Sequence, residues 1–219
     1  MAVQRELARR SPPPWHRPRR RLLVAGCFVC FARGVRGPGA QGDPAWGGGA
    51  LLSGRRLIAT VAVEGAAGAP YEPGLLALRE GPLLEAALRA LPEDPDVVMV
   101  DASARDHPRG AGLALHLGAI LDVPSIGVTD RPLVAEAIPV PDRRGETSPL
   151  RLRGREVGRR LRTRPGARAV CVHPGWRMEA ETAVQIVLAT TRRARTPEPL
   201  RRARRAARQA RAAHRIDRG

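Results

Sequence analysis

The sequence predicts an α/β protein with a mixed central sheet flanked by helices. Two short apolar runs, Val97–Val100 and Ser125–Val128, stand on either side of a helical stretch at Gly112–Leu121. Strand, helix and strand in this order are typical of a crossover between two parallel, buried strands. An apolar meander precedes the crossover, and a chain of 219 residues with 43% hydrophobic content is long enough to bury a full core.

The part of the chain before the crossover supplies a short helix, the meander and a longer helix. Apolar runs predict the strands, a Gly/Pro-rich run between them predicts a loop, and apolar residues at helical spacing predict the longer helix. In chain order the expected elements are a helix at Val3–Arg10, a strand at Leu22–Phe31, a loop at Gly34–Gly49, strands at Ala50–Ser53 and Leu57–Val63, and a helix at Leu75–Leu91.

The part after the crossover returns to strands and ends in helices. The expected elements are strands around Val134–Val140, Arg151–Arg153, Val157–Thr163 and Ala169–Val172, and a helix at Ala180–Arg193. The last segment, Pro197–Arg215, is rich in helix formers but has almost no apolar stripe beyond Ala. A helix there is expected to be solvated, or to form against a polyanion.

Positive charge gathers at the two ends of the chain. The formal net charge is +17, with 7 Arg against one acidic residue over residues 1–21 and 11 Arg against two over residues 192–219. A GC-rich coding sequence would explain why the chain uses Arg in place of Lys. It would not explain why the two ends lack acidic residues to balance their Arg residues. Basic ends are typical of phosphate-backbone binding. We therefore expect a basic arm at 1–21, a folded domain at 22–193 and an Arg-rich tail at 194–219, with nucleic acid as the partner of both ends.

Residues 17–32 allow a second interpretation. The basic RPRRR is followed by the apolar LLVAGCFVCFA, which is the layout of a secretory signal. The same apolar run, Leu22–Ala32, is also a good first strand for the sheet, and that interpretation needs no removed segment. The apolar run Leu22–Ala32 is also too short to span a membrane. We therefore expect a cytoplasmic protein without a membrane segment.

The three cysteines are Cys27, Cys30 and Cys171. The spacing of the first two suggests a redox pair or half of a zinc site, but residues three apart on a strand point to opposite faces. A zinc ribbon would need a second pair of cysteines, which the sequence lacks. The odd number of cysteines also argues against an exported domain held together by disulfides. All three are therefore expected to be small core residues.

A tyrosine between two prolines begins the longer helix. In PYEPGLLALRE, Pro70 and Pro73 fix their own backbone and restrict the residue ahead of each, so Tyr71 should stand on a stiff, exposed loop. A rigid aromatic of this kind can be pushed between stacked bases. The alternative is a capped loop that only leads into an amphipathic helix.

The motifs that follow carry a resemblance to a known family. The run VVMV ends in Asp101 and leads into DASARDHPRG, then GLALHLGAILD, PSIGV and RLRTRPGARAVCVHPGWRMEAETAVQIVL. Their order and spacing resemble endonuclease V, a family that nicks DNA or RNA near deoxyinosine or inosine with a metal-dependent, RNase H-like fold. The resemblance covers about Leu22 to Ala203.

The resemblance implies hydrolysis of a phosphodiester with Mg²⁺ at the scissile phosphate. It makes Glu80 and Asp101 the catalytic and metal-binding carboxylates. Beside these motifs, the stiff loop of Pro70, Tyr71 and Pro73 is expected to act as a wedge against nucleic acid. Each carboxylate also has a purely structural interpretation. Asp101 would cap the following loop or helix, and Glu80 would be a solvated residue paired with Arg79 or Arg89. His107 matches a family histidine, and His173 lies three residues before another expected one; both are also ordinary structural positions.

The chain departs from the family pattern at several positions. Phe28 stands where the first strand carries a metal-binding Asp, and Trp176 stands where the family has a His. Asp130 replaces a Lys, and Ala102 and Ala104 replace glycines that allow close approach of a flipped base.

Two of four implied catalytic residues therefore remain. This leaves two hypotheses: a weak endonuclease V-like nuclease, or an inactive relative that still binds nucleic acid. A metal site rebuilt from Asp106, Asp130 and Glu179 with Asp101 is a further alternative. The RNase H-like fold places Phe28 on a strand beside the one that ends at Asp101.

Overall fold

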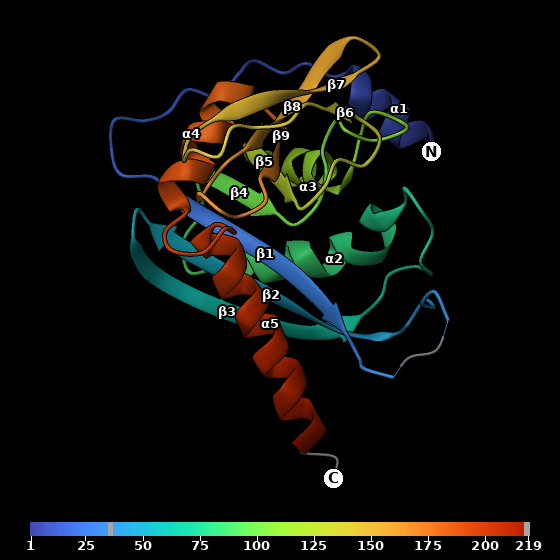
Figure 1. The fold of residues 1–219 in the computed structure, drawn as a ribbon. Helices are drawn as coiled ribbons and strands as arrows, with labels where there is room; N and C mark the ends of the chain where they lie inside the picture. The colour runs from blue at the N-terminus through green and yellow to red at the C-terminus, as the bar shows by residue number, and fades with distance from the viewer. Residues whose placement is uncertain (35–36, 217–219) are drawn as a thin grey trace.

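A nine-stranded mixed sheet forms the centre of the molecule in the computed structural model, which describes residues 1–34 and 37–216 (Figure 1). The strands are β1 (Leu23–Phe31), β2 (Pro44–Ser53), β3 (Arg56–Ala66), β4 (Val97–Val100), β5 (Ser125–Thr129), β6 (Glu136–Ala137), β7 (Thr147–Leu152), β8 (Arg155–Leu161) and β9 (Val170–Pro174). Their order in the sheet is β3-β2-β1-β4-β5-β9-β8-β7-β6. β4 is parallel to β1 and β5, and the other neighbouring pairs are antiparallel. The predicted mixed sheet and parallel crossover are confirmed.

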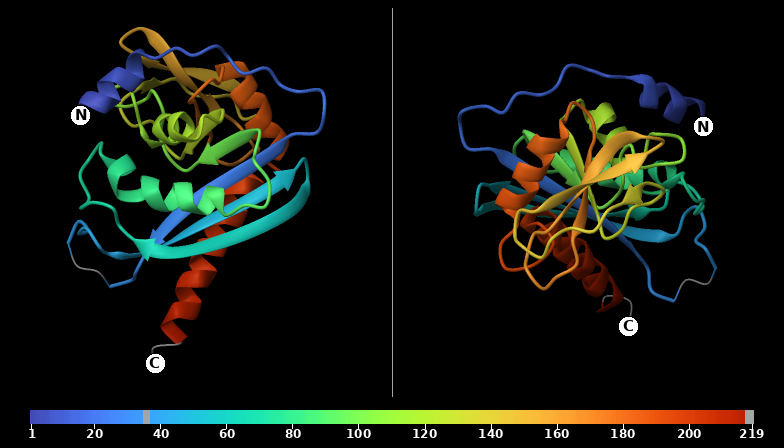
Figure 2. Two further views of the ribbon diagram at one scale, coloured as in Figure 1. Left: turned by 180° about the vertical axis from the view of Figure 1, so that it is seen from behind. Right: turned by 45° about the horizontal axis from the view of Figure 1, so that its top comes forward.

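Helices cover both faces of this sheet. They are α1 (Ala2–Arg9), α2 (Leu76–Arg89), α3 (Leu113–Leu121), α4 (Ala180–Thr190) and α5 (Glu198–Ile216). α2 and α3 pack on one face, and α4 and α5 pack on the other, as the front and back views show (Figures 1 and 2). The molecule therefore has three layers, with a separate apolar core on each side of the sheet.

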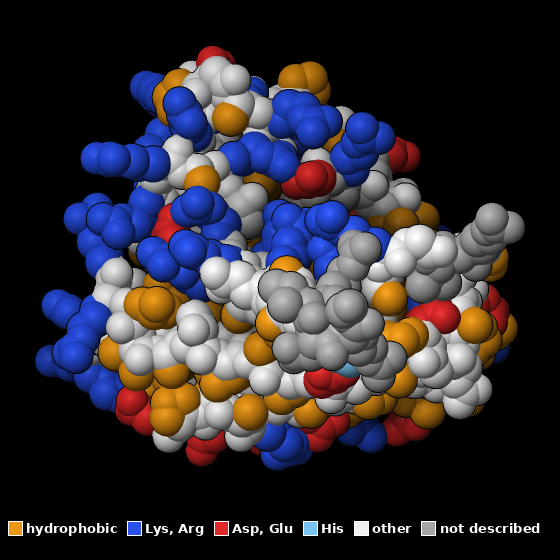
Figure 3. All heavy atoms as spheres, turned by 90° about the horizontal axis from the view of Figure 1, so that it is seen from below, with side chains coloured by type: hydrophobic (Ala, Val, Ile, Leu, Met, Phe, Trp, Pro, Cys, Tyr) orange, Lys and Arg blue, Asp and Glu red, His pale blue; other side chains and the backbone are white. Residues whose placement is uncertain are grey.

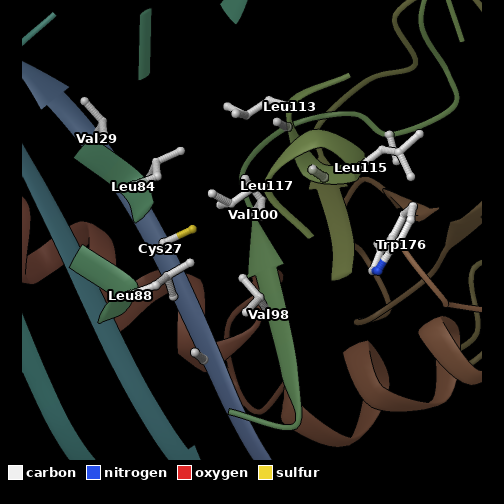
Figure 4. Packing of buried hydrophobic residues seen from close by; sticks show 14 of the residues in the cluster. Cys27, Val29, Leu84, Leu88, Val98, Val100, Leu113, Leu115, Leu117 and Trp176 are labelled. Carbon is white, nitrogen blue, oxygen red and sulfur yellow. The ribbon is translucent and has the colours of Figure 1, made fainter. Parts of the chain in front are cut away.

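The central strand β1 divides its side chains between the two cores. Cys27 and Val29 point toward α2 and α3, where they meet Leu84, Val100 and Leu113 (Figure 4). Successive strand residues face opposite ways, so Phe28 points toward α5. This alternation explains why the apolar run is nearly continuous, because the strand is buried on both faces. The strand interpretation of this run is confirmed.

The glycine-rich run ahead of the meander is a strand rather than a loop. β2 begins at Pro44, inside the segment predicted to be a loop, and Gly48 pairs with Phe28 of β1. A Cβ on Gly48 would come 2.2 Å from the Ala203 carbonyl oxygen of α5. Gly48 therefore lets α5 lie close to the sheet, while Gly47 and Gly49 do the same for α2 on the other face. The loop prediction is wrong from residue 44 onward.

Several smaller boundaries also differ from prediction; β7, for example, begins at Thr147 rather than at Arg151. α4 ends at Thr190 rather than at Arg193, and the hydroxyl groups of Thr190 and Thr191 donate to carbonyl groups of its last turn. Only two residues of the strand expected at Val134–Val140 pair in the sheet, as β6.

The last helix is not solvated on all sides. α5 packs across β1 and β2 through Leu200, Ala203 and Ala207, which are all buried. Its arginines lie on the other sides of the helix, and its last turns project beyond the sheet (Figures 1 and 2). The expectation of a solvated or polyanion-induced helix is wrong for its buried face. Residues 217–219 of the predicted tail lie outside the described part.

The cysteines behave as the sequence predicts. Cys27, Cys30 and Cys171 are buried and make no disulfide. Within the ranges that the structure describes, no helix is long and apolar enough to cross a membrane.

Candidate functional site

The predicted carboxylates meet at a small cavity beside the central strands. Glu80 of α2, Asp101 directly after β4 and Phe28 of β1 all line this cavity of about 140 Å³. β1 and β4 are parallel neighbours, with Cys27 level with Val100. The predicted placement of Phe28 beside Asp101 is confirmed, and we call this space the carboxylate cavity.

Glu80 is in a poorly solvated environment. Burial raises the pKa of this carboxyl to about 7, with a further contribution from the negative charge of Asp101. The two arginines considered as its surface partners lie elsewhere: Arg79 pairs with Asp43, and Arg89 pairs with Glu85. The solvated-residue interpretation of Glu80 is therefore wrong, and the group is able to hold a proton near neutral pH.

Asp101 is held by an arginine from α5. The Arg204 guanidinium donates from Nη2 to Asp101 Oδ2 at 2.6 Å. Its central carbon lies 5.1 Å from the ring centre of Phe28, and that of Arg208 lies 5.7 Å from the same ring. Both distances are in the range of cation–π contacts. No local sequence pattern indicates Arg204, because its partner is 103 positions away in the chain.

These residues do not fit a magnesium site. Mg²⁺ requires hard oxygen ligands in near-octahedral array. The cavity offers two carboxylates, one of them already bound to Arg204, and position 28 supplies no oxygen ligand because it is a phenylalanine whose ring is turned toward α5. Over residues 1–34 and 37–216, no group of three or more His, Cys, Asp or Glu side chains is placed to hold a metal.

Two of the three alternative carboxylates, Asp106 and Asp130, are occupied with other partners. Asp106 is fully buried and accepts hydrogen bonds from the backbone N–H groups of residues 133–135, each at 2.8 Å. Asp130 forms an ion pair with Arg195. The structure thus gives no support to a site rebuilt from Asp106, Asp130 and Glu179.

The two candidate histidines lie outside the carboxylate cavity. His173 is buried on β9, where Nε2 lies 2.9 Å from Thr129 Oγ1 and burial lowers its pKa to about 4. His107 is also buried, with Nε2 3.2 Å from the Gly74 carbonyl oxygen. Burial is the main cause that lowers the pKa of His107. Both imidazole rings are therefore neutral at neutral pH, and each is hydrogen-bonded inside the fold.

Trp176 is likewise not a cavity residue. Its indole N–H donates to Asp122 at 2.8 Å, and its ring packs in the core on the α2 and α3 face (Figure 4). Restoring a histidine at this position would thus place it among core side chains, away from Glu80 and Asp101.

A second cavity, of about 210 Å³, lies beside the predicted wedge. Its lining includes Tyr71, Gly74, Ala102, Ser103 and His107. Ala102, which is predicted to replace a family glycine, is thus part of the wall of this cavity.

Tyr71, the predicted wedge residue, stands on a loop that the buried side chain of Arg79 holds in place. Tyr71 is 47% exposed, and its backbone N–H donates to the Gly39 carbonyl at 2.9 Å. Arg79, only 5% exposed, donates to the carbonyl of Ala69 and to Asp43. Together with the prolines at 70 and 73, these bonds hold the tyrosine outward, as the prediction of a stiff, exposed loop requires.

Comparison with known proteins identifies close relatives. The family model for endonuclease V matches residues 50–205. An endonuclease V from Methanopyrus kandleri is 50% identical over 139 residues, which cover 64% of this chain. That match spans 60% of the relative's own length.

Solved structures agree along nearly the whole chain. The endonuclease V of Streptomyces avermitilis superposes with a TM-score of 0.87 at 34% identity, over 97% of this chain and 92% of that one. The endonuclease V of Ciona intestinalis, in complex with a 24mer DNA containing an inosine followed by a ribo-adenosine, has a TM-score of 0.79 at 19% identity over 95% of each chain. The second likeness shows the fold alone, and together they confirm the predicted RNase H-like architecture. Because the family model spans more than half of the sequence, the chain belongs to the endonuclease V family.

Proposed function

We propose that the protein binds nucleic acid as an endonuclease V relative, and that its metal-dependent cleavage near deoxyinosine or inosine is very slow or lost. The family as a whole is metal-dependent. The observation that carries the proposal is the carboxylate cavity, where Phe28 brings no ligand and Arg204 is bound to Asp101. A site with so few free oxygen ligands is expected to bind Mg²⁺ weakly and to position no attacking water.

Basic surfaces support the nucleic-acid partner. Arg201, Arg205 and Arg208 are exposed on α5 and border a hollow of about 410 Å³. Seen from below, Arg side chains form a broad patch over one half of the molecule, while acidic and apolar side chains line the opposite rim (Figure 3). The Ciona relative binds inosine-containing DNA with the same fold. We also propose that the protein works in the cytoplasm, in the repair or processing of inosine-containing strands.

The test combines a nicking assay with a binding assay on the same inosine-containing duplex and single strand. We expect binding that weakens steeply with salt, because counterions are released from the strand. We expect no detectable nicking with Mg²⁺ or Mn²⁺. Metal-dependent nicking that Asp101→Ala abolishes would instead establish the active-nuclease hypothesis.

The contribution of the last helix needs substitutions rather than truncation. Removing residues 196–219 would strip α5 from the sheet and expose the face of β1 and β2. Arg205→Gln with Arg208→Gln keeps the buried face intact. This double variant should reduce the salt slope by up to about 0.9 for each phosphate that is no longer neutralised. An unchanged slope would show that α5 does not touch the strand.

Tyr71→Ala tests the wedge. We expect weaker binding to mismatched and single-stranded substrates by about 1 to 3 kcal/mol, the range for one base–aromatic stack, and little change on perfect duplex. The measurement is a set of fluorescence anisotropy titrations, with Leu78→Ala, an exposed apolar residue on α2, as the matched control. Equal losses on every substrate would favour the purely structural interpretation of the loop.

A further inference from the structure

A fixed positive charge from α5 lies beside Asp101, one of the residues that line the carboxylate cavity. Arg204 approaches Asp101 to 2.6 Å while its guanidinium lies over the ring of Phe28. The side chain is about one third exposed, so it is neither a free surface arginine nor a sealed core group. It comes from α5, whose position is fixed by the buried residues Leu200, Ala203 and Ala207.

Phe28 and Arg204 are chemically complementary to each other. An aspartate at position 28 would add a carboxylate beside Asp101, and two such groups attract a divalent cation. Phe28 removes that charge and supplies an aromatic face, and an aromatic face binds guanidinium better than it binds a hydrated metal ion. Asp101 then has one negative charge, which one arginine neutralises.

Arg204 also retains unused hydrogen-bonding capacity. Its Nε is buried and has no hydrogen-bond partner within the ranges that the structure describes. A guanidinium has five donor hydrogens, and the hydrogen bond to Asp101 uses one of them. The same side chain borders the hollow on α5 together with Arg201, Arg205 and Arg208.

We propose that Arg204 takes the place of the divalent cation at Asp101 and that, with Arg208, it forms a metal-independent binding site for a phosphodiester phosphate. Arginine is suited to this role because its planar fork matches phosphate oxygens. The site deepens the proposed function and rests on it, since it names which group receives the backbone where metal-dependent relatives use an ion.

The first experiment measures Mn²⁺ binding by electron paramagnetic resonance. The wild type and Phe28→Asp should both bind Mn²⁺ weakly, because Arg204 still occupies Asp101. The double variant Phe28→Asp with Arg204→Ala should bind at least about tenfold more tightly, which corresponds to one recovered charge-assisted interaction. Two matched controls are Phe28→Asn with Arg204→Ala, which lacks the added charge, and Phe28→Asp with Arg205→Ala, which removes a neighbouring arginine.

A Phe28→Asp protein that binds Mn²⁺ as tightly as the double variant would overturn the proposal, since Arg204 would then not exclude the metal. Thermal unfolding of each variant shows whether it is folded. If Arg204→Ala proves unstable, Arg204→Gln serves as the second neutral variant, because it keeps much of the side-chain length.

The second experiment measures binding of a short fluorescein-labelled single strand of DNA in EDTA and in Mg²⁺. Wild-type binding should be full in EDTA and should gain nothing from Mg²⁺, which only competes as a counterion. Arg204→Ala should lower the affinity by about tenfold or more, whereas Arg205→Ala should have a smaller effect. Binding that requires Mg²⁺, or that Arg204→Ala leaves unchanged, would overturn this inference alone. A wild-type protein that binds no strand in either condition would contradict the proposed function as well.

Discussion

Replacing Gly48 with Ala should destabilise the fold by about 3 kcal/mol, the upper part of the usual range for overpacking a core. The added Cβ would lie 2.2 Å from the Ala203 carbonyl oxygen and 2.8 Å from the Ala207 backbone nitrogen. Both are backbone atoms of α5, so no flexible side chain can move aside. The helix must shift away from β2, and its packing against β1 loosens as well.

Urea unfolding monitored by circular dichroism measures this loss. Gly81→Ala on α2 is the matched control, because a Cβ there meets no atom within 4 Å. That variant should be stabilised by about 0.5 to 1 kcal/mol, the usual gain when Ala replaces Gly in a helix. Equal effects of the two substitutions would contradict the close approach of α5 to the sheet.

Glu80→Gln should change how stability depends on pH. The pKa of Glu80 is raised from 4.5 to about 7 in the folded protein, chiefly by burial. A raised pKa means that the folded state holds the proton more tightly than the unfolded state. The wild type should therefore lose stability as pH rises from about 4.5 to about 7, and the variant should not. Each pKa unit is worth about 1.4 kcal/mol, so above pH 7 the variant should be more stable by about 3 kcal/mol.

Denaturant titrations below and above this pH window check the prediction. Glu85→Gln, on the same helix, is the control: Glu85 pairs with Arg89 near the surface, and exposed pairs contribute at most about 1 kcal/mol. A difference between wild type and Glu80→Gln that stays constant with pH would show that Glu80 remains charged in the fold.

Much of the fold was predictable because its signals are local. The apolar runs of β1, β4 and β5 are buried on both faces of the sheet, so they appear as continuous hydrophobic stretches. The glycine strand was not predictable in this way. Residues 47–49 lack side chains because helices lie close to them on both faces, and the neighbours that require this are far away in sequence.

The candidate site was likewise predictable only in part. Glu80 and Asp101 were implied by the family resemblance that the motifs carry, and the structure places both at one cavity with Phe28. Arg204 was missed because α5 has few large apolar residues, and its buried face consists mainly of Leu200 and two alanines. The spacing of those residues along one side of the helix was the available signal. The functional roles of the site residues, and the division into arm, domain and tail, stay predictions.

The position of α5 also determines when the chain can finish folding. β1 begins at Leu23, yet one of its faces is covered by a helix that starts at Glu198. Arg211 donates to the Phe31 carbonyl across a sequence separation of 180 residues. Contacts of such high contact order form late and slowly. During synthesis the apolar surface of β1 and β2 therefore stays open until α5 has left the ribosome, and a chain that stops before α5 would be prone to aggregation and would need chaperone protection.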